Sequence, residues 1–525
     1  TEDPAPWIAK LLDEDRAARI TVAGEERFAA AADVPRYRDF EGLEELLLRY
    51  ARRRGPFRTE EAAGRFGVSI PRVEAILKRL ESEGRLTRGE REWYDVEVLR
   101  RLKRRTIEKL RKEAAPVEPA VLGRFLPAWQ GLADRGRGIA RLEEALARLE
   151  GLPLPWSSLV EHVLPGRVED FRLEMLDMIS ASGAFVWVGQ GALGSRDGRV
   201  AFYRRERAPL LLGLPPAYLP RSELEARILD TLSLRGASFE VELAPREGSL
   251  SVEALREALL HLMWEGRITN DTFFPLRRLG KTERRTGRSR PRPPMPKFAG
   301  GRWSLVEGLL DPSLSETERA HARVTMLLER YGLVSRAVAQ FEEIPAGYAS
   351  IYPLLREMEE RGRLRRGHFV EGLPGSQFAL PGAVERLRAH RGNSDRAGEE
   401  IRTLLAVDPA NPYGSILPWP ESHRGGNPRR VPGAWVLLYR GALALFLEKG
   451  GRTLLTFSPL SDPEVARAVL GALRDLPRRR PHRLRIGSID DQPPVASPYF
   501  ALLSELGFFR EASSMVYADY PRLGS

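Results

Sequence analysis

The stretch Leu80-Glu-Ser-Glu-Gly84-Arg-Leu86 decides the fold, because its spacing recurs along the chain. An apolar helical residue stands four positions before a glycine, and an apolar or β-prone residue follows two positions after it. The other copies are Ile179-Ser-Ala-Ser-Gly183-Ala-Phe185, Leu262-Met-Trp-Glu-Gly266-Arg-Ile268 and Met358-Glu-Glu-Arg-Gly362-Arg-Leu364. Glycine accepts the left-handed conformation that ends a helix. Since two apolar helical stretches precede each copy, the sequence predicts winged helices in tandem.

The composition indicates several domains and a polyanionic partner. A chain of 525 residues is too long for one core, and about three to five domains are expected. The formal net charge is +11 and the isoelectric point is near 9.9. Basic residues cluster at 100–112 and 277–292, where each segment holds eight Lys or Arg against one Glu. These clusters favour nucleic acid over the alternative of an Arg-rich surface that only aids solubility.

The residues that are missing exclude several chemistries. The chain has no cysteine and seven histidines, which stand singly without the spacing of metal ligands. We therefore expect no metal and no cofactor. No signal peptide is visible, and the longest apolar runs are too short to span a bilayer. These features favour a cytoplasmic protein without a membrane partner.

The fold class expected is α+β and multidomain, with tandem winged-helix modules followed by a small β-barrel-like domain. Residues 399–406 are interpreted as a short helix, and strand-like runs follow at 434–438, 442–447 and 452–457. The opening residues contain no complete module, so we expect a fragment of a larger protein. The predicted divisions are a partial module at 1–37, winged helices at 38–113, 114–220, 221–275 and 316–396, a basic Pro-rich linker at 276–315, and the β-barrel-like domain at 397–525.

Arginines in the predicted wings and in the linker are the candidate DNA contacts. Each can neutralise a phosphate and make the affinity salt-dependent. In the first module, Ile70–Glu83 is the helix that would enter a major groove. The alternative is that the wings pack module against module and their arginines form internal ion pairs. The candidates are Arg85, Arg88, Arg91, Arg267, Arg363, Arg365 and Arg366 in the wings and Arg284 and Arg285 in the linker.

Two further positions could carry chemistry. Trp129 and Gln130 place an aromatic ring and an amide beside a helix end, where Trp can stack on a base and Gln can contact it or orient a water. Their alternative roles are a core residue and a cap. Asp519, between Tyr517 and Tyr520, offers a carboxylate among aromatic rings, as base excision requires. Its alternative is a strand end at the surface.

Four stretches resemble the C-terminal region of bacterial long Lhr (large helicase-related) proteins, and the likeness extends in order over nearly the whole chain. They are Arg124-Phe-Leu-Pro-Ala-Trp-Gln-Gly131, Val163-Leu-Pro-Gly-Arg-Val168, Gly189-Gln-Gly-Ala-Leu193 and Phe369-Val-Glu-Gly-Leu-Pro-Gly-Ser-Gln-Phe-Ala-Leu-Pro-Gly-Ala-Val384. The resemblance implies a DNA-repair-associated, ATP-dependent helicase that translocates 3′ to 5′. It also implies that a motor core in the same parent chain is a partner, and that this region self-associates into a homo-oligomer. No motor motif is present in these 525 residues.

The layout is also similar to AlkZ-type DNA glycosylases, which join tandem winged helices to a β-barrel. Those enzymes use a Gln-x-Gln or Gln-x-Asp pair, whereas Gln130 is followed by Gly131 and Leu132. Three hypotheses follow: a DNA-binding and oligomerising region of a repair helicase, a metal-free glycosylase for damaged or deaminated bases such as uracil, and an assembly platform whose wings face protein. In the second, Asp519 and Gln130 are the candidate catalytic residues.

Overall fold

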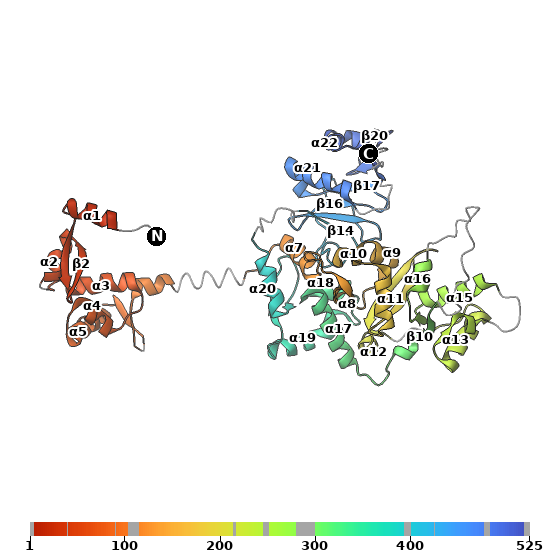
Figure 1. Cartoon of the computed structure of the whole chain (residues 1–525), viewed down its shortest axis with the longest axis horizontal. Coiled ribbons are helices and arrows are strands. Elements are labelled where there is room, and N and C mark those ends of the chain that lie inside the picture. The colour runs from red at the N-terminus through yellow and green to blue at the C-terminus, as the bar shows by residue number, and fades with distance from the viewer. Residues whose placement is uncertain are drawn as a thin grey trace. The chain divides into compact units, whose positions relative to one another are not determined.

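The computed structural model describes residues 5–38, 40–89, 91–102, 115–213, 217–244, 251–279, 300–392, 401–424, 426–476 and 483–518. These residues form two compact units, Thr1–Ala115 and Pro116–Ser525 (Figure 1). Among the described helices, none has the length and apolar character needed to cross a membrane.

The first unit opens with a helix and a two-stranded hairpin and continues as a winged helix. Its helices and strands are α1 (Ala5–Asp13), β1 (Ala17–Val22), β2 (Glu25–Ala30), α2 (Val34–Arg38), α3 (Leu43–Arg54), α4 (Thr59–Phe66), α5 (Ile70–Ser82), β3 (Leu86–Arg88) and β4 (Trp93–Asp95). The strands β3 and β4 pair as the wing, and Phe57 bridges Trp93 on its other side. Leu47, Val73 and Leu77 are fully buried between the helices.

The glycines of the repeated pattern end helices as predicted. Their φ angles are +71° at Gly84, +73° at Gly183, +66° at Gly266 and +72° at Gly362. Only glycine adopts this left-handed conformation without a steric penalty. A wing strand begins within three residues of each glycine, so the prediction of helix, glycine and strand is confirmed.

The second unit contains three more winged helices with one common sheet topology. In each, the third strand in sequence lies at the centre of the sheet and pairs with both the first and the second. The strand orders are β5-β7-β6, β8-β10-β9 and β11-β13-β12. The second winged helix comprises α7 (Pro119–Trp129), α8 (Gly138–Arg148), β5 (Leu154–Pro155), α9 (Trp156–Ser158), a π-helical turn at Leu159–Val163, α10 (Leu164–Arg167), α11 (Leu173–Ala181), β6 (Phe185–Ala192) and β7 (Gly198–Arg204). The short helix α12 (Ala208–Leu211) follows it.

The third and fourth winged helices repeat this order of elements. The third comprises α13 (Glu223–Arg235), β8 (Ser238–Phe239), α14 (Glu240–Leu243), α15 (Val252–Trp264), β9 (Ile268–Asn270), α16 (Phe274–Arg278) and β10 (Arg302–Leu305). The fourth comprises α17 (Glu316–Tyr331), β11 (Leu333–Val334), α18 (Arg336–Phe341), α19 (Gly347–Glu360), β12 (Arg365–Gly367), β13 (Gln377–Ala379) and α20 (Pro381–Ala389). Strand β10 lies within the segment expected as a linker, yet it pairs with both β8 and β9.

The long wing of the second winged helix packs against the third. The hydroxyl of Thr269 donates to the carbonyl of Trp187 at 2.5 Å, and the Trp187 indole donates to the carbonyl of Thr272 at 3.2 Å. Gly189 lies so close that an added Cβ would be 2.1 Å from the carbonyl oxygen of Met263. This wing therefore fits the alternative in which wings pack module against module, because it holds the second winged helix against the third.

The C-terminal strands form two sheets, and the expected β-barrel-like domain is not confirmed. The five-stranded order is β14-β15-β16-β17-β19 and the three-stranded order is β18-β21-β20. In the described residues the end strands of neither sheet pair with each other, so no closed barrel is found. The elements are β14 (Ile401–Leu405), β15 (Trp435–Tyr439), β16 (Ala442–Leu447), β17 (Thr453–Thr456), α21 (Pro463–Ala472), β18 (Arg483–Ile486), β19 (Ser488–Ile489), α22 (Phe500–Glu505), β20 (Phe509–Glu511) and β21 (Ser514–Ala518).

The short helix expected at residues 399–406 is wrong. Residues Ile401–Leu405 form β14, which pairs antiparallel with β15 along its whole length. The short segment has too few residues for a stable isolated helix, whereas pairing with an apolar neighbour satisfies its main chain. Tertiary context decides its structure.

Helix α7 fastens the C-terminal sheet to the winged helices. An added Cβ at Gly123 would lie 2.0 Å from the carbonyl oxygen of Gly441, in the turn between β15 and β16. Arg124 donates to the carbonyl of Arg440 at 2.5 Å and to that of His390 at 2.8 Å. The C-terminal end of α7, which carries Trp129, is thereby fixed among three domains.

Candidate nucleic-acid interface

The predicted wing arginines of the first unit differ in how many contacts they make with other side chains. Arg85 lies 3.9 Å from a carboxylate oxygen of Glu44, and the guanidinium of Arg88 lies 5.5 Å from the ring centre of Trp93. Arg91 is exposed, and its side chain has no hydrogen-bond or ion-pair partner in the described part of the chain. Exposed cations with weak partners can contact phosphates at little cost.

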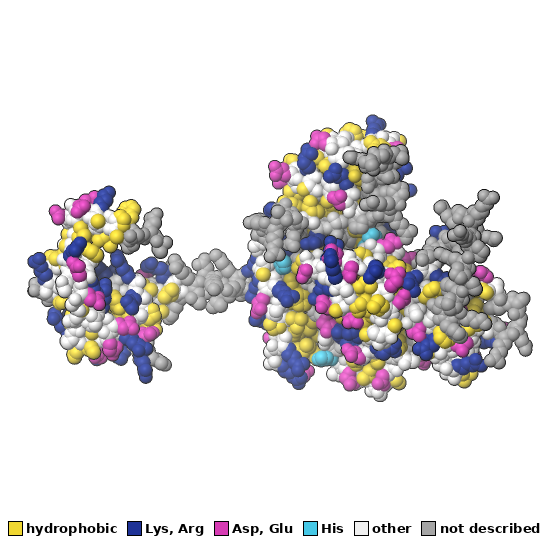
Figure 2. Space-filling view, in the orientation of Figure 1, with side chains coloured by type: hydrophobic (Ala, Val, Ile, Leu, Met, Phe, Trp, Pro, Cys, Tyr) yellow, Lys and Arg dark blue, Asp and Glu magenta, His cyan; other side chains and the backbone are white. Residues whose placement is uncertain are grey.

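The wing arginines of the fourth winged helix are similarly mixed. Arg365 pairs with Glu385 at 3.1 Å. Arg363 and Arg366 are exposed, and neither side chain has a partner among the described residues. On the visible face in Figure 2, Lys and Arg side chains are interspersed with Asp and Glu. The candidate contacts are therefore individual arginines on separate wings.

The remaining predicted residues fall in different settings. In the third winged helix, the guanidinium of Arg267 stacks on Tyr218 at 4.7 Å from its ring centre. Arg284, Arg285 and Asp519 lie outside the described residues.

Trp129 and Gln130 end helix α7 against the fourth winged helix. The Trp129 indole donates to the carbonyl of Glu329 at 3.0 Å. The Gln130 amide, only 1% exposed, donates to the carbonyl of Arg330 at 2.6 Å and accepts from Arg167 at 3.1 Å. Both ends of this amide are thus engaged inside the protein. Trp129 is half-buried, and its ring carries the guanidinium of Arg386 at 5.5 Å from the ring centre.

Beneath Gln130, Arg167 joins the second winged helix to the C-terminal domain. Its guanidinium contacts both carboxylate oxygens of Asp408, at 2.8 and 2.9 Å. Arg167 is fully buried and Asp408 is 4% exposed. A bidentate pair fixes both position and orientation of its members. Both oxygens of the Asp408 carboxylate accept from Arg167, and one also accepts from the main-chain N–H of Ala410 at 2.8 Å.

Arg430 supports the loop that presents Asp408. It donates to the main-chain carbonyls of Asp408, Asn411 and Tyr413 at 2.9 to 3.0 Å. Burial lowers the pKa of Arg430 to about 10, so the side chain stays charged near neutral pH. The loop is thereby held by a cation for which the described residues provide no direct ion pair.

A second buried pair ties the second winged helix to the fourth. The fully buried Arg330 pairs with Glu342 and donates to the main-chain carbonyls of Arg148 and Glu150. Tyr331 donates to the other Glu342 oxygen at 2.5 Å. Burial and the nearby carboxylate hold the pKa of Tyr331 well above its ordinary value, so the phenol keeps its proton.

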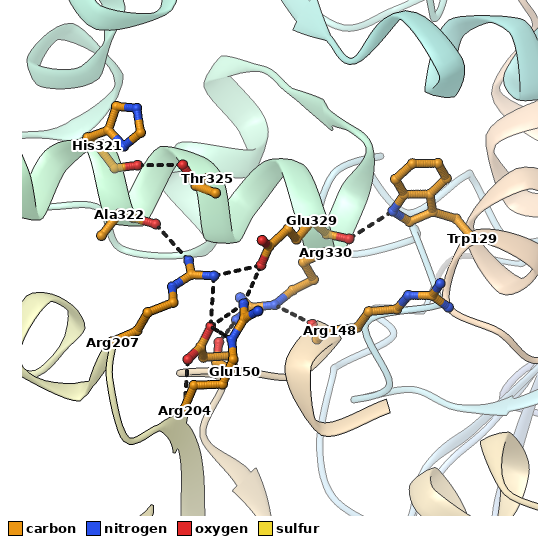
Figure 3. A network of polar contacts seen from close by, with 10 residues as sticks. All are labelled: Trp129, Arg148, Glu150, Arg204, Arg207, His321, Ala322, Thr325, Glu329 and Arg330. Carbon is orange, nitrogen blue, oxygen red and sulfur yellow. Dashed lines mark hydrogen bonds and ion pairs between the residues drawn. The ribbon is translucent and has the colours of Figure 1, made fainter. Parts of the chain in front are cut away.

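The network continues into the wing of the second winged helix (Figure 3). The Glu150 carboxylate is fully buried and accepts from Arg204 at 2.7 Å and Arg207 at 3.2 Å. Both arginines also contact Glu329, at 2.5 and 2.9 Å. The buried carboxylates of this region are therefore ion-paired, and their arrangement fixes domain positions. Within the described residues, no group of three or more metal-ligating side chains occurs.

Two partly buried arginines that the sequence did not single out lie beside Gly131. A Cβ added at Gly131 would lie 2.4 Å from Nη2 of Arg141 and 3.0 Å from Nη1 of Arg148. Arg141 and Arg148 both belong to α8, and their spacing of seven residues puts them on one helix face. That spacing is a signal in the sequence, but it lies on a helix outside the predicted wings.

Two segments of the chain match known domain models. Residues 117–205 and 313–399 match models described as the winged-helix domain of large helicase-related protein, the third and the fourth respectively. The chain is similar to the C-terminal region of the large helicase-related (Lhr) proteins. This bears out the resemblance seen in the sequence.

Two curated relatives bear the Lhr name. One, from Mycolicibacterium smegmatis, is named Lhr helicase/probable uracil glycosylase; it is 38% identical over 518 residues, 90% of this chain and 34% of its own length. The other, from Escherichia coli, is named Lhr helicase/uracil glycosylase; it is 34% identical over 579 residues, 97% of this chain and 37% of its own length. The chain thus spans about a third of each Lhr relative.

Among solved structures, the DNA glycosylase AlkZ of Streptomyces sahachiroi matches 69% of this chain and 97% of its own, at 14% identity and a TM-score of 0.40.

Proposed function

We propose that this chain is the DNA-binding and self-associating C-terminal region of an Lhr-type, ATP-dependent 3′-to-5′ DNA helicase that acts in repair. The observation that carries the proposal is the match of two winged-helix domains and of 90% or more of the chain to Lhr proteins. The net charge of +11 and the exposed wing arginines support DNA as the partner. The motor core would be supplied by the same parent chain.

In this proposal the wings have different roles, since some contact DNA and one packs against a neighbouring domain. The second wing is used for packing on the third module, so it contributes structure. The exposed Arg91, Arg363 and Arg366 would supply phosphate contacts, and Arg85, Arg88, Arg267 and Arg365 would supply further ones. Arg284 and Arg285 would add charge from the basic segment.

Binding and self-association are tested separately. Fluorescence anisotropy with a labelled single-stranded oligonucleotide, without ATP, measures the affinity over a series of salt concentrations. Multi-angle light scattering measures the mass in solution. Salt-sensitive binding by a particle heavier than one chain supports the full proposal, and a monomer that binds DNA removes only self-association.

A second candidate function is a metal-free DNA glycosylase for deaminated bases. It is favoured by the printed names of both relatives, which include a uracil glycosylase. Asp519 would activate water or stabilise the sugar cation. Gln130 would act by positioning, since its amide holds Arg167 and the fourth winged helix.

The glycosylase test is incubation with uracil-containing and undamaged single-stranded oligonucleotides, followed by alkali cleavage. Cleavage only at uracil that is lost in Asp519→Ala supports the enzyme and its acid. Loss in Gln130→Ala with unchanged thermal unfolding would place the site at the end of α7. No cleavage by the wild-type chain, with DNA binding intact, would exclude the glycosylase for this region.

A further inference from the structure

Two arginine side chains converge at Gly131, and one of them, Arg148, has no ion-pair partner among the described residues. Nη2 of Arg141 and Nη1 of Arg148 both approach the space that a Cβ on this residue would occupy. The φ of Gly131 is +78°, so the main chain turns there in a conformation natural to glycine. A side chain at this position would fill the space between the two guanidinium groups.

The two arginines of α8 are not equivalent. Arg141 is tied to the protein: it donates to the carbonyls of Gly131 and Asp134 at 2.9 and 2.6 Å and pairs with Glu144 at 2.8 Å. The half-buried Arg148 guanidinium has no hydrogen-bond or ion-pair partner in the described part of the chain. In Figure 3 it extends toward the side on which Trp129 lies.

The surroundings of Arg148 are predominantly basic. Burial lowers the pKa of Arg148. The positive charges of Arg141, Arg167 and Arg386 lower the same pKa further, and the carboxylate of Glu144 raises it. Arg167 is neutralised by Asp408, whereas the exposed Arg386 has only the Trp129 ring as its described contact. Partial burial of several positive charges close together raises the free energy of the folded state, and a bound anion would offset this increase.

We propose that Arg148 and Arg386, with Arg141 fixed behind them, bind one phosphate group of a nucleic-acid strand beside Trp129. Guanidinium groups match phosphate oxygens in pairs of hydrogen bonds. Helix α8 supplies the first cation and α20 supplies the second. The end of α8 is held by Arg330, which donates to the main-chain carbonyl of Arg148. This inference rests on the proposed DNA-binding function and assigns it a site away from the wings.

The test is the salt dependence of single-stranded oligonucleotide binding in Arg148→Ala. Loss of one phosphate contact reduces the slope of log K against log salt by about 0.7 and weakens binding by roughly 3- to 10-fold at low salt. Arg148→Lys keeps the charge and should keep the slope, with weaker affinity because the fork is lost. Arg361→Ala is the matched control, since Arg361 is an exposed arginine that directly follows α19 and pairs with Glu357.

The outcomes separate the site from the function. If Arg148→Ala retains the wild-type slope and affinity, as Arg361→Ala should, the phosphate site is overturned while DNA binding stands. If the wild-type chain shows no salt-sensitive binding, the proposed function itself fails. Should Arg148→Ala unfold, the exposed Arg386→Ala decides: an unchanged slope overturns the site, and a reduced slope supports it.

Discussion

The Arg167 guanidinium and the Asp408 carboxylate form a bidentate, buried ion pair at 2.8 and 2.9 Å although 241 residues separate them. The pair places the π-helical turn and α10 of the second winged helix against the loop that follows β14 in the C-terminal domain. Through Gln130, the same guanidinium is connected to the main chain of the fourth winged helix. One side chain thereby fixes three domains.

Removing the Asp408 side chain should destabilise the second unit strongly. Asp408→Ala leaves the buried Arg167 without its counter-charge, which costs about 3–5 kcal/mol of the free energy of unfolding. Urea unfolding followed by circular dichroism measures the change. Glu505→Ala, which breaks the exposed pair with Arg467, should cost about 0–1 kcal/mol; equal effects of the two substitutions would contradict the role of Asp408.

The close approach of α7 to the C-terminal sheet depends on Gly123. In Gly123→Ala the new methyl group would overlap the carbonyl of Gly441, and such overpacking costs about 1–3 kcal/mol. Thermal unfolding measures the loss. Gly382→Ala in α20, where nothing lies within 4 Å of the added Cβ, should leave stability unchanged or slightly raised. A tolerated Gly123→Ala would show that the sheet does not pack tightly on α7.

His162 should make stability depend on pH. Its ring lies 4.9 Å from that of Trp435, and burial holds its pKa below the ordinary value of 6.5. In the interval between the folded pKa and 6.5, the unfolded chain binds the proton and the folded chain does not. Stability is therefore complete above the unfolded pKa and falls as the pH drops through this interval.

The pH effect is assigned with His162→Gln. Urea unfolding of the wild-type chain at pH values from about 8 to about 5 should show a decreasing free energy of unfolding. The variant should lack the part of this decrease that begins near the ordinary histidine pKa. A variant with the wild-type pH profile would place the responsible group elsewhere.

The exposed wing arginines of the fourth winged helix should carry DNA affinity. Removing both in Arg363→Ala/Arg366→Ala should reduce the slope of log K against log salt by about 0.7 for each phosphate contact on single-stranded DNA. Anisotropy titrations over a salt series measure the slope. Arg365→Ala, which removes an arginine already paired with Glu385, should have a smaller effect; the opposite ranking would argue against exposed charge as the criterion.

The repeated helix-glycine-strand pattern predicts much of the winged-helix architecture, because local rules control it. Gly84 and Gly362 end their helices with positive φ for the reason that the sequence suggested. Pairing over long distances is not encoded in this local pattern. Strand β10 joins β8 and β9 from beyond a Pro-rich segment, and β14 takes its structure from β15.

The sequence singles out the Trp129-Gln130 pair, and the fold places it at a corner where three domains meet. That this corner is a functional site stays a prediction. Its partners Arg167, Arg330 and Asp408 are distant in sequence, and single buried charges carry no local periodicity that would reveal them. Arg148 was missed because its significance depends on Gly131 and Arg386, which only the fold brings close.

The proposed function requires that this chain bind DNA through its arginines. The most direct measurement is the dissociation constant for a labelled single-stranded oligonucleotide, without ATP, over a range of salt concentrations. We expect a linear decrease of log K with log salt, with a slope that corresponds to several phosphate contacts. Absent binding, or binding that does not change with salt, would contradict it.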